Sequence, residues 1–173
     1  MEKAKTNNEI KWLLVDQMAD LTAAVCMGRD FLTAYSQSKL TMIQTMTRLR
    51  ICNHSLILSL YKVWEIRDKY NQHLYSLDSA HVGPLFSYAK EIDKRNINKF
   101  RSRYAAHIWD LKDKPISLVE AQILLDTITG ENNSKVQEFY DWIWLDGEPC
   151  VVTALHQLIN YLRTLPGGDF ARF

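Results

Sequence analysis

The sequence predicts an all-α protein, an up-and-down antiparallel bundle of four to six helices. Glycine and proline are scarce, six and four in 173 residues, so long elements can run without breakers. Apolar residues recur at spacings of three and four, the period of a helix with one buried face. No segment favours a strand, because Val151-Val152-Thr153 is short and continues into helix-forming residues. Short connections between the helices indicate antiparallel neighbours.

The length and composition fit one globular domain, residues 1–173. Hydrophobic residues make up 47% of the chain and aromatic residues 11%, which is enough to form a core and is atypical of disorder. We expect residues 8–165 to form the folded bundle and residues 1–7 and 166–173 to be loose termini.

The first two helices are expected over about residues 8–32 and 40–70. Asn7 or Asn8 can cap the first, and Ser38 or Thr41 can open the second. Gly28 interrupts the apolar pattern of the first helix. It predicts either a close helix contact or a kink.

The third helix is expected from about Leu85 to Trp109, after a loop or helix entry at residues 77–84, and Pro115 lies beyond its end. Ser117 and Glu120 have the spacing of a capping box, which predicts a fourth helix that stops at Gly130. Two more helices are expected at about residues 134–145 and 149–165.

Charge and cysteine content exclude several classes of protein. The net charge of +1 gives no general basic excess, so any nucleic-acid role must depend on a local site. Cys26, Cys52 and Cys150 have neither a disulfide framework nor a metal-binding spacing, and we expect free thiols in a reducing compartment. Neither a signal peptide nor an apolar run of membrane-spanning length is evident. We therefore expect a cytoplasmic protein.

No motif for a metal or cofactor is present. The sequence has no glycine-rich phosphate loop, no G-x-S-x-G and no H-E-x-x-H. Its five histidines, at positions 54, 73, 81, 107 and 156, share no close metal-ligand spacing. We expect no metal and no cofactor.

The segment from Arg101 to His107 is the best chemical candidate. Arg103 and His107 are four residues apart and share a helix face, whereas Arg101 lies about 120° around the helix. Histidine can move a proton near neutral pH, and arginine binds phosphate as a bidentate fork. The set therefore suits phosphodiester chemistry without a metal. On spacing alone, a solvated helix face with one half-buried histidine is the commoner explanation, because an arginine and a histidine one helical turn apart occur by chance in many helices.

The run Phe100-Arg101-Ser102-Arg103-Tyr104-Ala105-Ala106-His107 resembles the signature of HEPN domains, an arginine followed after four to six residues by a histidine. It is closest to the form R-x-(K/R)-x-x-A-H of abortive-infection members. Residues 55–66, SLILSLYKVWEI, are similar to the helix upstream of that motif. The resemblance covers about residues 10–130.

The resemblance implies a helical bundle that forms a homodimer, with two motifs facing each other across a two-fold axis. It implies a metal-independent ribonuclease of a defence or toxin–antitoxin system, with RNA as substrate and a cognate antitoxin as a possible partner. Arg101 and His107 would be the catalytic pair, and Ser102, Arg103, Tyr104 and Asp110 would support them. Arg103 remains a rival for the role of Arg101, because it shares the face of His107.

Two departures from the family pattern keep a second hypothesis open. Ser102 stands where Asn, Asp or His is common, and the acidic residue Asp110 comes one position later than usual. The alternative is a non-catalytic HEPN-like dimer that binds RNA or protein. A third hypothesis is an unrelated helical interaction module.

Three further features each allow two interpretations. Phe139, Tyr140, Trp142 and Trp144 can plug the end of the bundle or stack on bases. The basic residues between Lys90 and Arg103 can form a solvated face or meet RNA phosphates. His54 can be a histidine hydrogen-bonded near the core or a polar contributor to a site.

Overall fold

The computed structural model describes residues 2–102 and 117–172, and within them the chain is all-helical. The helices are α1 Glu2–Ser36, α2 Met42–Lys69, α3 Asn71–Tyr75, α4 Ser79–Lys94, α5 Ile97–Phe100, α6 Leu118–Thr129, α7 Asn133–Ile143 and α8 Val151–Thr164. No strand occurs among these residues, so the predicted fold class is confirmed. None of the helices found there is long and apolar enough to cross a membrane.

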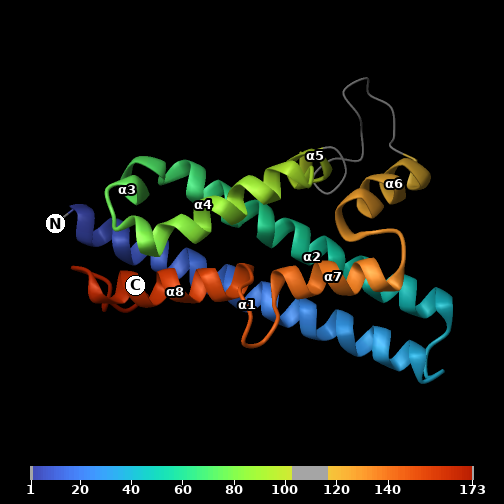
Figure 1. The fold of residues 1–173 in the computed structure, drawn as a ribbon. Helices are drawn as coiled ribbons and strands as arrows, with labels where there is room; N and C mark the ends of the chain where they lie inside the picture. The colour runs from blue at the N-terminus through green and yellow to red at the C-terminus, as the bar shows by residue number, and fades with distance from the viewer. Residues whose placement is uncertain (1, 103–116, 173) are drawn as a thin grey trace.

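The long helices α1 and α2 form a hairpin on which the other helices pack (Figure 1). α8 and then α7 lie along α1, while α4 packs against both α2 and α8. α6 lies beside α5 and α7 at the opposite end of the bundle from the two termini. Each long helix contributes one apolar stripe to a common core, which includes Leu14, Leu21, Leu56, Leu60, Leu85, Ile92, Leu155 and Leu158.

Two capping boxes fix helix starts where the sequence indicated them. The Thr41 hydroxyl accepts a hydrogen bond from the backbone N–H of Gln44, and Ser117 accepts one from Glu120. In each pair the side chain at the third position accepts from the cap residue's own N–H in return. α6 stops at Gly130, which has a positive φ of 94°. The last two helices match the expected ranges to within about two residues.

Gly28 permits a close helix contact, and α1 continues through it without a break. A Cβ atom built on Gly28 would lie 2.5 Å from the Tyr140 Oη of α7. Tyr140 is fully buried, and its hydroxyl donates a 2.9 Å hydrogen bond to Asn53 Oδ1 on α2. The missing side chain at position 28 therefore makes room for an aromatic ring that joins three helices.

The region of the third expected helix differs from the prediction. α4 begins at Ser79, six residues before the expected start, because the Asp78 carboxylate caps the backbone N–H of Ala80 at 3.0 Å. Pro84 lies within this helix. The helix then stops at Lys94, and Asn96 adopts a left-handed conformation with a φ of 60° before α5 begins. The expected end near Trp109 lies outside the described residues.

The structure also differs from the expectation of loose termini. α1 begins at Glu2, so residues 2–7 are helical and neither Asn7 nor Asn8 is its cap. Asn7 instead donates from its amide to Pro166 O. The buried Lys11 ammonium donates to Gly168 O at 2.7 Å and to Phe170 O at 2.8 Å, so α1 binds the C-terminal tail.

Candidate functional site

Arg101 follows directly on α5 and is held against α2. Phe100 is fully buried and anchors the end of α5 in the core. The half-buried Arg101 guanidinium lies over the ring of Tyr61, 4.7 Å from its centroid, in a cation–π contact. The structure thus fixes the first residue of the predicted catalytic pair at the surface of the bundle.

Ser102 lies on the exposed side of the same turn. Its hydroxyl donates to Asn98 O at 2.8 Å and contacts Lys99 O at 3.3 Å. These bonds return the hydroxyl to its own helix, a common arrangement for serine within helices. The Ser102 hydroxyl proton is therefore bonded to carbonyl groups one turn earlier in the chain.

The remaining predicted site residues, Arg103, Tyr104, His107 and Asp110, lie outside the described residues. Whether His107 approaches Arg101, and whether Arg103 competes with Arg101, both stay predictions.

His54 lies beside this site on α2. Its ring makes an edge contact with Phe100, with the two ring centroids 5.5 Å apart and an interplanar angle of 75°. Desolvation by burial lowers the pKa of His54, and the nearby charge of Arg50 lowers it further. Both effects favour the neutral form of the imidazole. His54 therefore packs against the buried Phe100, and its contribution to a site stays a prediction.

Tyr61 is the site residue that the sequence analysis missed. It lies seven residues after His54, which places both side chains on one face of α2. Phe100 packs against the first and Arg101 against the second. The spacing from His54 to Tyr61 was a usable signal, although an aromatic residue at a helical spacing is usually taken for part of the core.

Large apolar side chains are also exposed on α2 and on α6. Ile43 and Ile51 of α2 are 74% and 67% exposed, and Val119 and Ile123 of α6 are 69% and 58% exposed. Residues of this size are usually covered when several gather together. We call Ile43, Ile51, Val119 and Ile123 the α2/α6 apolar face.

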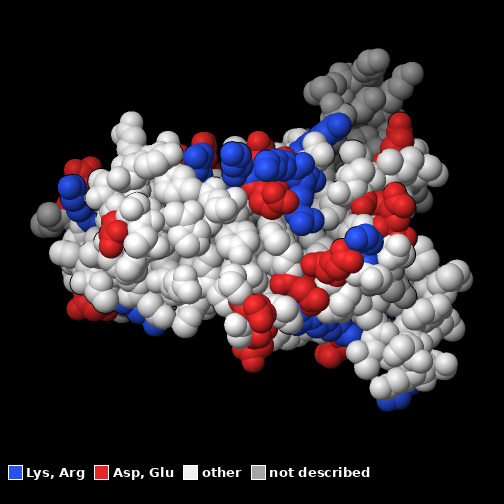
Figure 2. Space-filling model, viewed as in Figure 1, with Lys and Arg blue, Asp and Glu red and all other residues white. Residues whose placement is uncertain are grey.

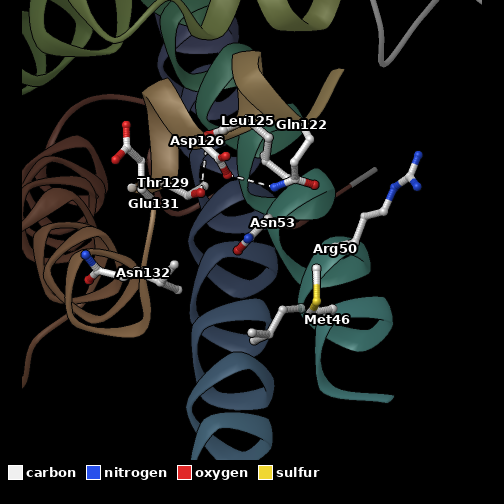
Figure 3. A pocket seen from close by; sticks show the side chains of 12 residues that line it. Met46, Arg50, Asn53, Gln122, Leu125, Asp126, Thr129, Glu131 and Asn132 are labelled. Carbon is white, nitrogen blue, oxygen red and sulfur yellow. Dashed lines mark hydrogen bonds between the residues drawn. The ribbon is translucent and has the colours of Figure 1, made fainter. Parts of the chain in front are cut away.

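A pocket of about 150 Å³ opens between α2 and α6 at the N-terminus of α7 (Figure 3). Two of its polar side chains are bonded to each other, and a third is bonded to a residue outside the pocket. Gln122 donates to Asp126 at 2.7 Å, and the buried Asn53 holds Tyr140. Arg50 extends away from Asn53 in the close view. The lining thus mixes acidic, amide and apolar groups with no single ligand chemistry.

The basic stretch and the aromatic cluster meet between α4 and α7. The Arg95 guanidinium lies 4.3 Å from the Trp142 ring centroid, and the Tyr88 ring is 6.1 Å from Trp142, edge to face. Ser87, Tyr88, Lys90, Glu91, Lys94 and Trp142 line an open pocket of about 370 Å³. Figure 2 shows Lys and Arg gathered in a band over α4 and α5, with Asp and Glu predominating over α6 and α7 on the same face.

The aromatic cluster is divided between two roles. Phe139 and Tyr140 are buried and fill the core, as the plug interpretation expects. Trp142 and Trp144 are only half-buried, and each lies next to an arginine, Arg95 and Arg29 respectively. The surface half of the cluster is thus available for contacts outside the bundle.

The cysteines and the acidic and imidazole groups add no further chemical centre in the part of the chain that is described. Cys26, Cys52 and Cys150 are free and buried or half-buried, as expected. Across residues 2–102 and 117–172, no three His, Cys, Asp or Glu side chains come together in a way that could hold a metal ion.

Comparison with known proteins shows where this fold recurs. No family model matches the chain, and no curated protein matches it. Among solved structures, the chain is similar to the integron cassette protein Vpc_cass2 from the mobile metagenome of V. paracholerae. The TM-score is 0.73 at 24% sequence identity, over 89% of this chain and 93% of that one. This likeness extends over nearly the whole of both chains and shows a shared fold.

Proposed function

We propose that this protein is a HEPN-like, metal-independent endoribonuclease of a defence or toxin–antitoxin type. Arg101 and His107 act as its catalytic pair. The observation that supports this best is the position of Arg101, fixed by the buried Phe100 and by the ring of Tyr61. A cation that stabilises developing charge on a phosphate is effective only if it is held in place before the reaction.

The chemistry follows from the two side chains. His107 accepts the proton of a ribose 2′-hydroxyl, whose oxygen attacks the adjacent phosphorus and forms a new P–O bond. The bond from phosphorus to the 5′-oxygen breaks, and that oxygen takes a proton from water, to which His107 returns the proton that it accepted. Arg101 stabilises the negative charge on the non-bridging oxygens. The products are a 2′,3′-cyclic phosphate and a 5′-hydroxyl, and no metal is required.

The proposed enzyme is a homodimer formed through the α2/α6 apolar face. Ile51 of this face lies about one turn of α2 before His54, whose ring contacts Phe100, so a second copy packed around Ile51 would bring its own Arg101 segment near the first. Burying the four exposed apolar side chains on each copy would also remove them from water, which favours association.

The alternative is a non-catalytic dimer that binds RNA or protein. The Ser102 hydroxyl favours this alternative, because it donates its proton to its own helix at the position where the family often has Asn, Asp or His. In that case Arg101 serves as a phosphate contact only.

The test compares RNA cleavage by the purified protein in EDTA with cleavage by His107→Ala. We expect a loss of at least about 100-fold, the usual contribution of a general acid or base. His156→Ala is the matched control, since His156 is exposed on α8, which packs against α1 and α4. Equal cleavage by His107→Ala would overturn the assignment of His107. RNA binding without cleavage in the parent protein would establish the non-catalytic alternative.

A further inference from the structure

We propose that α4 carries a binding track for single-stranded RNA. In this track the Tyr88–Trp142 pocket receives a nucleobase, and Lys90 and Lys94 bind the adjoining phosphates. The inference rests on the proposed function, because it names the surface that would deliver RNA to the Arg101 segment.

The charges of α4 and α5 are arranged for a polyanion. Between residues 90 and 102 the chain carries five cations and two carboxylates. Glu91 is paired with Arg95 at 3.3 Å, and Asp93 accepts from the Asn98 amide at 2.9 Å. Lys90, Lys94 and Lys99 are exposed. The carboxylates of this stretch are thus bound to their neighbours, while three ammonium groups face solvent.

The lysines of the track lead along α4 and α5 toward Arg101. Lys90 and Lys94 are one helical turn apart on α4 and project from the same side. The break at Asn96 restarts the helix as α5, which carries Lys99 and ends next to Arg101. On the same face of the molecule, Asp and Glu predominate over α6 and α7, which adjoin the basic surface of α4 and α5 (Figure 2). A phosphate chain is therefore attracted along α4 and repelled from the adjoining surface.

The aromatic pocket makes RNA a better occupant than an acidic protein. Tyr88 and Trp142 form apolar walls beside the two lysines, and the exposed Ser87 offers a hydroxyl at the rim. Trp142 is held by Phe139, with the ring centroids 6.0 Å apart, and by the Arg95 guanidinium, which lies 4.3 Å from the Trp142 centroid and adds a further cation beside the pocket. A rigid aromatic wall next to cations is the usual way to bind a base and its phosphate without reading its sequence. An acidic protein would need only the lysines.

The experiment measures binding of fluorescein-labelled oligouridine of about twelve nucleotides, within the usual site size of such tracks. All proteins carry His107→Ala so that the RNA stays intact. Adding Lys90→Gln and Lys94→Gln should weaken binding about tenfold. The fall of log K with log salt should also become shallower, its slope shrinking in magnitude by about 1.4, because each of the two lost single-strand phosphate contacts contributes about 0.7. The matched control is Lys5→Gln with Lys39→Gln, which removes the same charge from exposed positions off α4.

A second arm tests the pocket without any substitution in it. Oligouridine carrying 5-iodouridine is irradiated in the complex, and the cross-linked peptides are identified by mass spectrometry. Cross-links to Tyr88 or Trp142 are expected, and cross-links confined to other positions would overturn the base pocket. Displacement of the RNA by polyglutamate of equal charge would also overturn it, since the track would then recognise charge alone.

The two proposals fail in different ways. If the His107→Ala protein binds RNA and the variant that also carries Lys90→Gln and Lys94→Gln binds it equally well, the proposed track is wrong and the proposed function stands. If the His107→Ala protein binds no RNA at all, both the track and the proposed function are overturned.

Discussion

Gly28 is the residue whose side chain the bundle can least accept. An added methyl group would collide with the buried Tyr140 ring, and that ring cannot move without losing its hydrogen bond to Asn53. We expect Gly28→Ala to lower the free energy of unfolding by about 1–3 kcal/mol, the usual cost of overpacking a core. Urea denaturation measures this directly.

Gly83 provides the matched control for Gly28. It is also within a helix, but a Cβ atom there would meet nothing within 4 Å. Gly83→Ala should therefore raise the free energy of unfolding, by about 0.5 kcal/mol, through the helix propensity of alanine. Equal effects of the two substitutions would contradict the close contact at Gly28.

His54 and His73 make stability depend on pH. Burial lowers the pKa of both below the ordinary value of 6.5. Between the folded-state pKa and 6.5, the unfolded chain binds more protons than the folded chain, so stability is complete above pH 6.5 and falls as the pH drops. We expect a lower free energy of unfolding at pH 5 than at pH 7.5.

His73→Gln tests this linkage, because glutamine can still donate to Asn7, which lies 2.7 Å from His73 Nε2, but does not titrate. The loss of stability between pH 7.5 and pH 5 should be smaller in this variant than in the parent. His156→Gln is the matched control, because it makes the same replacement at an exposed position. A pH dependence identical in all three proteins would show that His73 does not contribute.

At the scale of the helices, Lys11 joins α1 to the C-terminal tail. Its ammonium is buried and donates to two tail carbonyls, while its hydrocarbon stem lies in the bundle. We expect Lys11→Met to lower the free energy of unfolding by about 1–3 kcal/mol, because the tail carbonyls lose a charged donor. Amide hydrogen exchange in residues 167–172 should accelerate at the same time.

Lys5→Met is the control for this prediction, since Lys5 is exposed on the same helix. Tail exchange that remains equally slow in Lys11→Met and Lys5→Met would contradict the role of Lys11.

Local signals in the sequence predicted the helix ends that local chemistry fixes. The capping box at Ser117 and the stop at Gly130 depend on residues within one turn, so they could be found without the fold. The start of α1 could not, because residues 2–7 gain contacts from a tail more than 150 residues away in the sequence. The break at Asn96 was also missed, since Arg95 and Asn96 look like part of a polar helix face.

In the candidate site, too, some features follow from the local sequence and others depend on how the helices pack. Arg101 was identified from a short motif in the sequence. Its anchoring by Tyr61 depends on the packing of α5 against α2, which no local pattern specifies. The meeting of Lys90, Lys94 and Trp142 likewise depends on how α7 lies beside α4, so two features that seemed separate in the sequence became one surface.

At the scale of the whole molecule, we propose that two copies share the Arg101–His107 chemistry across the α2/α6 apolar face. Its four side chains are exposed, and one of them, Ile51, lies about one turn of α2 before His54. A dimer through it would explain both the exposed apolar side chains and the position of Arg101 at the surface.

The most direct test is complementation between two inactive variants. Arg101→Ala and His107→Ala are purified separately, mixed and allowed to exchange subunits, and RNA cleavage in EDTA is then measured. The mixture should recover up to about a quarter of parental activity, because half of the dimers are mixed and each mixed dimer holds one intact pair. Adding Ile51→Glu to both variants should abolish this recovery, whereas Met27→Glu, an exposed apolar position on α1, should not. A mixture as inactive as its two components, beside an active parent, would contradict a site shared between two copies.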